Sequence, residues 1–141
     1  MPVYTYRFIR LPSEHRSYTR LPLLIQNPDN GRQIATMGLV DTGADSSLFP
    51  AALATQLGHD LKGCKVKTTL TAGIEQKDII AYKHTFQVAL LSPDMRRVVW
   101  KRRIEIDCAE SNPPLLLGVD DFLCRFKMTI DYLAKRLTLC W

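Results

Sequence analysis

The sequence predicts an all-β protein, mainly β with two short helices, folded as a small closed or partly closed β-barrel. Short apolar and β-branched runs recur along the chain with turn residues between them, which is typical of small barrels. Only two stretches carry a helical pattern, and both are short. The chain has 141 residues, of which 46% are hydrophobic, and this suffices for one domain with a real core.

The first half of the chain holds a predicted strand, a hairpin and a helix. Residues 3–9 alternate loosely between apolar or aromatic and polar side chains, which predicts a strand, and a polar loop follows. Residues 21–40 are predicted as a hairpin, because the dense turn signal at 27–31 divides two apolar runs. Pro50 suits the first position of a helix, and the helix formers at 51–57 continue it.

The second half is predicted as strands around one further helix. The predicted strands are 65–71 and 74–82, paired about Ala72-Gly73, then 84–91, 98–108 and 115–117, and a last hairpin of 128–132 with 136–140. In residues 119–126 the apolar side chains fall at i, i+3, i+4 and i+7, which predicts an amphipathic helix. Asp120 and Asp121 would lie in its first turn, where negative charge is favourable.

The most informative stretch runs from Leu39-Val40 into Asp41-Thr42-Gly43, where an apolar strand delivers an acid into a glycine turn. This pattern fits an Asx-type turn or a catalytic carboxylate. Two carboxylates close together cannot both ionise, so such a pair can activate a water and polarise a carbonyl. Because the chain has one such stretch, a two-fold homodimer would be needed to place Asp41 opposite its own copy.

Residues 39–45, Leu-Val-Asp-Thr-Gly-Ala-Asp, resemble the active-site motif of the retropepsin-like (retroviral-protease-type) single-domain aspartic protease family. Residues 115–118, Leu-Leu-Leu-Gly, resemble the family's apolar-apolar-Gly element, which passes behind the active-site loop in that fold. Residues 120–132 resemble its C-terminal helix and strand. The resemblance covers roughly residues 21–140, and it implies that residues 1–141 form a single retropepsin-like domain, active as a two-fold homodimer.

The resemblance also implies a function, a homodimeric aspartic endopeptidase that hydrolyses protein or peptide substrates without metal or other cofactor. Asp41 would supply half of the catalytic pair, Thr42 would hold the two loops together across the axis, and Gly43 would bind the substrate backbone. Further substrate contacts are implied for Ala44, Asp45 and the flap residues Ala72, Gly73 and Ile74, and structural support of the site for Leu117 and Gly118.

Three positions qualify these expectations. Val119 stands where the family often has an Arg that pairs with the acid at position 45, so Asp45 is expected to lack that partner. The flap tip around Gly73 has fewer glycines than the family's. Ala44 offers no hydroxyl to donate to the carboxylate pair, so we predict an activity optimum at weak rather than strong acid.

Two alternatives stay open. A catalytically inactive retropepsin-like dimer could bind extended peptides or a partner protein by strand addition. The basic residues at 96–97 and 101–103 could contact nucleic acid, but one cluster without a binding motif fits a solvated hairpin better, and we do not expect this partner. The dimer contact is open too, with 3–9 and 136–141 as candidate strands.

Other features exclude further classes of protein. The four cysteines form no C-x-x-C pair and have no nearby histidine at ligand spacing, so we expect no metal site and buried thiols rather than disulfides. We see no apolar run near the ~20 residues of a membrane span and no signal peptide. The default expectation is therefore a cytoplasmic protein, although a domain cut from a longer precursor would look the same. Trp100 and Trp141 are expected to be packing or interface residues.

Overall fold

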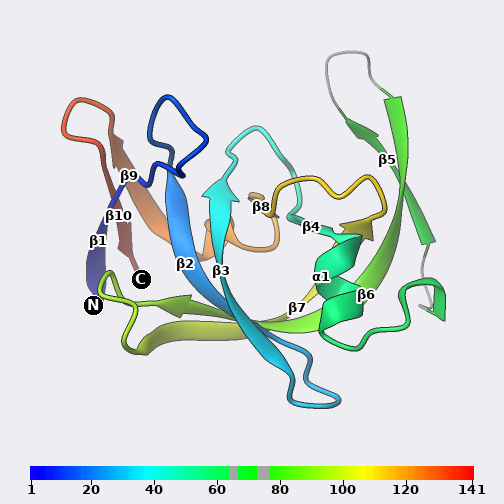
Figure 1. Cartoon of the computed structure of the whole chain (residues 1–141). Helices are drawn as coiled ribbons and strands as arrows, with labels where there is room; N and C mark the ends of the chain where they lie inside the picture. Colours follow the sequence, from blue (N-terminus) through cyan, green and yellow to red (C-terminus); the bar gives the residue numbers. More distant parts are fainter. Residues whose placement is uncertain (64–66, 73–76) are drawn as a thin grey trace.

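The computed structural model describes residues 1–63, 67–72 and 77–141, and it confirms the predicted all-β class with a closed barrel (Figure 1). The barrel closes because a six-strand ring that starts at β2 returns to it through β2–β6 pairing. In order around the ring, the strands are β2 (Arg20–Gln26), β3 (Gln33–Val40), β8 (Leu116–Leu117), β4 (Leu48–Pro50), β7 (Val98–Ala109) and β6 (Lys77–Leu91). Leu21, Leu23 and Ile25 of β2 are fully buried in the core that the ring encloses.

The predicted hairpin of residues 21–40 is confirmed as β2 and β3, which pair in unbroken antiparallel register. Two local features form its turn. The Asn27 side-chain oxygen accepts a turn N–H at 3.0 Å, and Gly31 has a φ of 76°, which favours glycine. The fixed register carries Val40 into the core and leaves Asp41 just beyond the end of the strand.

The long strand β6 differs from the prediction. The sequence predicted separate strands at 74–82 and 84–91, and this division is wrong. The pairing of β6 with β7 runs through Lys83 without a break, and buried and partly exposed residues alternate across it. Lys83 lies in the outward phase, where its Nζ is 3.5 Å from Asp107 Oδ1 on β7, so this charge does not end the strand. The strand β5 (Lys67–Ala72) pairs with the first part of β6 and extends beyond the ring.

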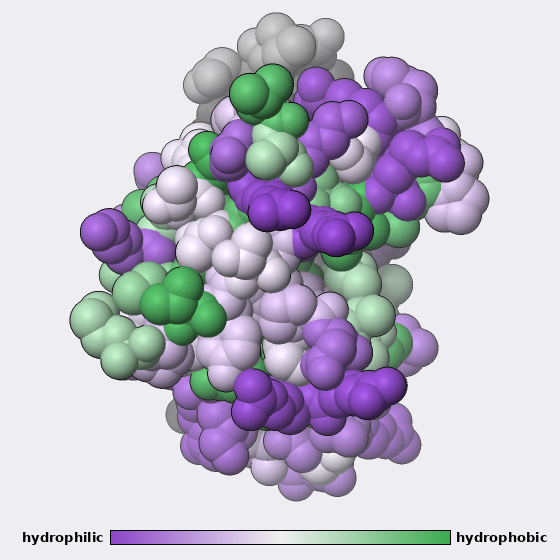
Figure 2. Space-filling view, turned by 90° about the vertical axis from the view of Figure 1, so that its left-hand side faces the viewer, coloured by the Kyte–Doolittle hydropathy of each residue, from purple (hydrophilic) through white to green (hydrophobic). Residues whose placement is uncertain are grey.

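A separate three-stranded sheet joins the two ends of the chain. Its order is β1 (Val3–Arg7), β10 (Arg136–Cys140) and β9 (Lys127–Asp131), all antiparallel. Both termini therefore lie together at one side of the molecule (Figure 1). Figure 2 looks at this side, where hydrophobic residues are scattered between weakly polar and strongly hydrophilic ones.

The first predicted helix is confirmed as α1 (Ala51–Gln56). Pro50 precedes it as the N-cap, with an extended ψ of 140°, so the expectation that Pro50 is the first helical residue is off by one position. Gly58 follows the helix with a φ of 87°, a backbone conformation that suits glycine at a helix end. The 3₁₀ turn η1 (Leu61–Gly63) then leads toward β5.

The second predicted helix, at 119–126, is wrong. The segment consists of turns and the 3₁₀ helix η2 (Leu123–Arg125). Leu123 N–H donates to the Gly118 carbonyl, a wider loop than an α-helical bond closes, and Arg125 N–H donates to the Phe122 carbonyl, a tighter one. A helical pattern over eight residues does not by itself hold a helix, because most helical stability comes from tertiary packing. The apolar stripe still predicted burial correctly for Phe122 and Leu123.

Both tryptophans pack against aromatic rings, as the sequence predicted. The Trp100 ring lies 5.3 Å from that of Phe122 and 5.0 Å from that of Phe126, and Trp141 lies 5.3 Å from Phe126 and 5.6 Å from Tyr4. This cluster joins the 119–126 segment to β7 and to the terminal sheet.

Within residues 1–63, 67–72 and 77–141, we find no helix with the length and hydrophobicity to cross a membrane.

Candidate active site

Asp41 follows β3 at the point where β3 pairs in parallel with the short strand β8. The Asp41 N–H continues this pairing by donating to the Leu117 carbonyl at 3.0 Å. Its own Oδ1 accepts the Gly43 N–H at 3.0 Å, and its carbonyl accepts the Ala44 N–H at 3.2 Å. The carboxylate is therefore held at the mouth of a tight turn, with Oδ2 accepting no hydrogen bond from any described residue.

The segment after β8 is hydrogen-bonded to the end of this turn. Val119 N–H donates to the Ala44 carbonyl at 2.9 Å, and Asp120 N–H donates to the Asp45 carbonyl at 2.7 Å. These bonds occupy main-chain groups only, so they impose no residue type at positions 119 and 120. Residues 41–45 are thus bonded to the β8 region at both ends.

A third contact was not found from the sequence. The buried Ser47 donates its Oγ–H to Asp121 Oδ1 at 2.7 Å and its N–H to the same carboxylate at 3.0 Å. The Gly118 N–H completes the set by donating to Ser47 Oγ at 2.9 Å. Asp121 was predicted as a helix-start acid, and this interpretation is wrong, because its carboxylate closes the loop that begins at Asp41. A serine and an acid 74 residues apart give no local signal.

Gly118 sits where no side chain fits. A Cβ built on it would lie 2.2 Å from the Ser46 carbonyl carbon, 2.5 Å from the Ser46 carbonyl oxygen and 2.6 Å from the Ser47 nitrogen. All three are main-chain atoms of the Asp41 loop, which cannot rotate away as a side chain can. The absence of a Cβ is therefore what allows the β8 region to approach the loop so closely.

The predicted site residues differ in exposure. Thr42, Gly43 and Asp45 are exposed, Asp41 and Ala44 are partly buried, and Leu117 is buried. Among the described residues, none makes a hydrogen bond or ion pair with the Asp45 carboxylate. Ala72 ends β5, whereas the predicted flap contacts Gly73 and Ile74 lie outside the described residues.

The loop of residues 9–19 lies beside the site and is braced by an ion pair. The Arg20 guanidinium donates to both Glu14 carboxylate oxygens, at 2.6 and 2.7 Å, and to the Ile9 carbonyl at 3.1 Å. Val40 N–H donates to the Thr19 carbonyl at 2.8 Å, which joins this loop to the strand before Asp41. The hydrogen bond from Arg20 lowers the pKa of Glu14 to about 2, so this pair stays ionised in weak acid.

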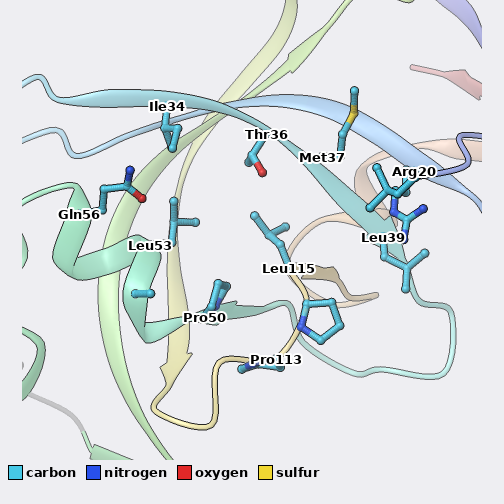
Figure 3. A pocket seen from close by; sticks show the side chains of 13 residues that line it. Arg20, Ile34, Thr36, Met37, Leu39, Pro50, Leu53, Gln56, Pro113 and Leu115 are labelled. Carbon is cyan, nitrogen blue, oxygen red and sulfur yellow. The ribbon is translucent and has the colours of Figure 1, made fainter. Parts of the chain in front are cut away.

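A pocket of about 570 Å³ lies between β3, α1 and the loop before β8 (Figure 3). It is mostly apolar, and its lining residues are Leu11, Arg20, Ile34, Thr36, Met37, Leu39, Pro50, Ala52, Leu53, Gln56, Pro113, Pro114 and Leu115. Leu39 belongs to the strand that delivers Asp41, but Asp41 does not line the pocket. The pocket is therefore a neighbour of the carboxylate and not the space around it.

A histidine pair lies away from the Asp41 loop, between α1 and β6. The rings of His59 and His84 are 4.7 Å apart, and His84 Nε2 lies 2.8 Å from the Leu61 carbonyl oxygen. Burial lowers the pKa of His59, and the neighbouring His84 lowers it further, while a hydrogen bond with the Thr85 backbone and the charge of Asp29 act in the opposite direction. Protonation of His59 is therefore expected to destabilise the fold in weak acid.

The structure also places the metal and nucleic-acid candidates. Across the described ranges, no three His, Cys, Asp or Glu side chains are grouped so as to hold a metal ion. Cys108 is buried and Cys140 partly buried, but Cys124 is exposed, so the expectation of buried thiols is wrong for Cys124. The basic residues at 101–103 are exposed on β7 at the rim of a hairpin.

Comparison with known proteins decides the fold. A scan against protein-family models found no match, and neither did a search of curated proteins. Among solved structures, the crystal structure of a retropepsin-like aspartic protease from Rickettsia conorii is similar to this chain. The two are 23% identical, with a TM-score of 0.57, and the match covers 98% of this chain and 91% of that chain. This chain has a retropepsin-like fold.

Within the retropepsin-like fold, the two motifs that carried the resemblance lie side by side. Residues 39–45 and 115–118 are far apart in the sequence, and the parallel pairing of β3 with β8 brings them together. Leu117 accepts the Asp41 N–H through its carbonyl, and Gly118 donates its N–H to the Ser47 hydroxyl and packs closely against the main chain of Ser46. At 23% identity the likeness establishes the fold, and the activity of this retropepsin-like chain is a matter for proposal.

Proposed function

We propose that this chain is a homodimeric aspartic endopeptidase. Asp41 and its symmetry copy share one proton, the ionised member takes a proton from a bound water, and the protonated member polarises the scissile carbonyl. The water attacks the carbonyl carbon, and the peptide C–N bond breaks as its nitrogen is protonated. Protein or peptide chains are the substrate, and no metal or organic cofactor takes part.

The observation that carries this proposal is the placement of the Asp41 carboxylate. One of its oxygens is fixed by the Gly43 N–H, the other accepts no hydrogen bond from the described residues, and the group is partly exposed on a braced loop. A turn residue needs only the first of these features. Catalysis needs all three, because a catalytic group must be held in position and still reach the substrate.

A second copy is required because the chain contains one Asp-Thr-Gly sequence. Thr42 and Gly43 are exposed next to Asp41, so they are available to a partner and to substrate. We assign Thr42 to the contact between the two loops, Gly43, Ala44 and Asp45 to the substrate backbone, and Leu117 and Gly118 to support of the turn.

The Asp41→Asn variant tests this function. Asn retains an oxygen for the Gly43 N–H, so the fold and the dimer are expected to persist. Cleavage of a peptide library should fall by about 10²- to 10⁴-fold, because the amide cannot exchange the proton. Asp60→Asn, at an exposed acid elsewhere on the chain, is the control and should cleave as the wild type does.

Wild type should cleave in weak acid, between roughly pH 4 and 7, because Ala44 has no hydroxyl to donate to the carboxylate pair. No cleavage anywhere in that range, by a protein that is dimeric and binds the peptides, would overturn the proposal in favour of an inactive peptide-binding dimer. Cleavage that survives Asp41→Asn would assign the reaction to another group.

A further inference from the structure

The edge strand β9 has a sequence that is complementary to itself. It reads Lys127-Met128-Thr129-Ile130-Asp131, and within the described chain only β10 pairs with it. Its other edge therefore presents unpaired N–H and C=O groups, which is the usual template for adding a strand. No proline, glycine or bulge interrupts β9, and its register with β10 is unbroken over all five residues.

A two-fold axis normal to this sheet would pair β9 with its own copy in antiparallel register. Such an axis keeps each side chain on its own face, and full overlap places Thr129 opposite Thr129. The same register sets Lys127 opposite Asp131 and Met128 opposite Ile130. Both charges then meet opposite charges, and each apolar residue meets an apolar one, which is the pattern that favours cross-strand pairs.

The two faces of β9 agree with this register. Lys127, Thr129 and Asp131 are exposed, whereas Met128 and Ile130 are partly buried and pack against the core. A paired copy would extend the exposed face as a polar ladder and the other face as a continued core. Asp131 Oδ1 already accepts the Ala134 N–H at 2.9 Å, which leaves its second oxygen to the lysine.

The opposite edge of the same sheet is the natural competitor, and it lacks this complementarity. Full antiparallel overlap of β1 with its copy would set Val3 opposite Arg7 and Tyr4 opposite Tyr6 about Thr5. No charge is matched in that register, and an exposed valine meets an exposed arginine. Hydrophobic residues are scattered on the side shown in Figure 2. Backbone pairing and charge complementarity are therefore expected to select a partner on this side more than the burial of apolar surface does.

β9 is also joined to the Asp41 loop by a short and well-bonded stretch of chain. Asp120 and Asp121 bond to Asp45 and Ser47, η2 follows, and β9 begins directly after it. This short connection fixes the position of the Asp41 loop relative to β9, and hence relative to a two-fold axis that passes through β9.

We propose that β9 is the dimer contact, with a second copy of this chain as its partner, paired in antiparallel register about Thr129. The proposal rests on the proposed function, which requires a second Asp41. It departs from the two candidates that the sequence offered, residues 3–9 and residues 136–141, of which the second forms the central strand β10 of this sheet.

A cysteine at the centre of β9 tests the register directly. Directly opposed residues of an antiparallel pair have Cα atoms about 4.5–5.5 Å apart, within the range that a disulfide spans. In full-length protein carrying Cys64→Ser, Cys124→Ser and Cys140→Ser, we expect Thr129→Cys to form a covalent dimer on oxidation with diamide. Thr5→Cys, at the exposed centre of the competing edge β1, is the matched control and should remain uncrosslinked.

A charge exchange tests the same register without a crosslink. Lys127→Asp should raise the dimer dissociation constant tenfold or more in sedimentation, because it sets two pairs of acids opposite each other. Adding Asp131→Lys to that variant should restore most of the affinity, since the charges are again matched. Failure of the second change to rescue a folded double variant would overturn the register.

The outcomes separate this proposal from the function on which it rests. An Asp41-dependent, active wild-type dimer whose Thr129→Cys variant does not crosslink, or in which Thr5→Cys crosslinks instead, overturns the β9 contact and leaves the protease standing. A crosslinked Thr129→Cys dimer in a protein that cleaves no peptide supports the contact and overturns the protease.

Discussion

Replacing Gly118 with alanine should displace the Asp41 loop. The new methyl group would lie 2.2 Å from the Ser46 carbonyl carbon and 2.6 Å from the Ser47 nitrogen, well inside van der Waals contact. These are main-chain atoms, so the clash cannot be relieved by a rotamer change. The φ of Gly118 lies outside the left-handed region, so the cost comes from space alone and not from backbone strain.

The size of the effect follows from these contacts. An added methyl group in a packed core typically costs about 1–3 kcal/mol, and a main-chain clash belongs at the upper end of that range. About 3 kcal/mol corresponds to a fall in melting temperature of roughly 6–12 °C for a chain near this size. Movement of the loop by about 1 Å would also lower peptide turnover by about 10²-fold.

Gly43→Ala is the matched control for stability. Its added Cβ would lie 3.4 Å from Asp41 Oδ1 and near no main-chain atom, which is ordinary contact. Calorimetry should therefore show a melting temperature close to that of the wild type for Gly43→Ala and a large fall for Gly118→Ala. Equal melting temperatures for the two variants would refute the argument that close approach at Gly118 holds the loop.

Three further predictions concern the Asp41 loop and the histidine pair between α1 and β6. Asp121→Ala removes the acceptor of a buried hydroxyl and N–H, so we expect a loss of about 1–3 kcal/mol in urea unfolding, whereas Asp120→Ala, at an exposed carboxylate, should change little. Because the pKa of His59 is lowered in the folded protein, the unfolded chain binds the proton first as the pH falls, so the free energy of unfolding should decrease below about pH 6.5. The His59→Gln variant should flatten this pH dependence, whereas His15→Gln, at an exposed histidine, should not. Ala44→Ser should shift the acidic limb of the pH–rate profile to lower pH, and an unchanged limb would count against a role for position 44.

The sequence predicted the strands and turns well where the signal is local. The hairpin of β2 and β3, the hairpin of β9 and β10, and helix α1 depend on alternation, turn residues and helix formers within a few positions. The predicted α-helix at 119–126 was wrong because the local pattern there fits two structures. A spacing of i, i+3, i+4 and i+7 marks which residues are buried, and a compact turn with η2 buries the same residues as a helix does.

Contacts between distant positions carry no such signal. The bonds of Ser47 to Asp121 and to Gly118 join positions more than 70 residues apart, and either residue alone fits an ordinary turn or cap. The Arg20–Glu14 brace was likewise missed, because the predicted polar loop of residues 11–20 indicates exposure and not a bonded pair. The charge pattern of β9 was visible in the sequence, but its meaning depends on β9 being an edge strand, which only the sheet order shows.

By itself, the sequence determined the all-β class, the strand that delivers Asp41 into its turn, and the short apolar strand that ends at Leu117. These follow from side-chain periodicity and turn chemistry, which act between near neighbours. Only the tertiary structure decided that the barrel closes through β2–β6 pairing, that Gly118 must lack a Cβ, and that Asp121 holds the loop. The physical reason is that packing and hydrogen bonding between distant segments depend on their meeting in space, and no local pattern of residues specifies that meeting.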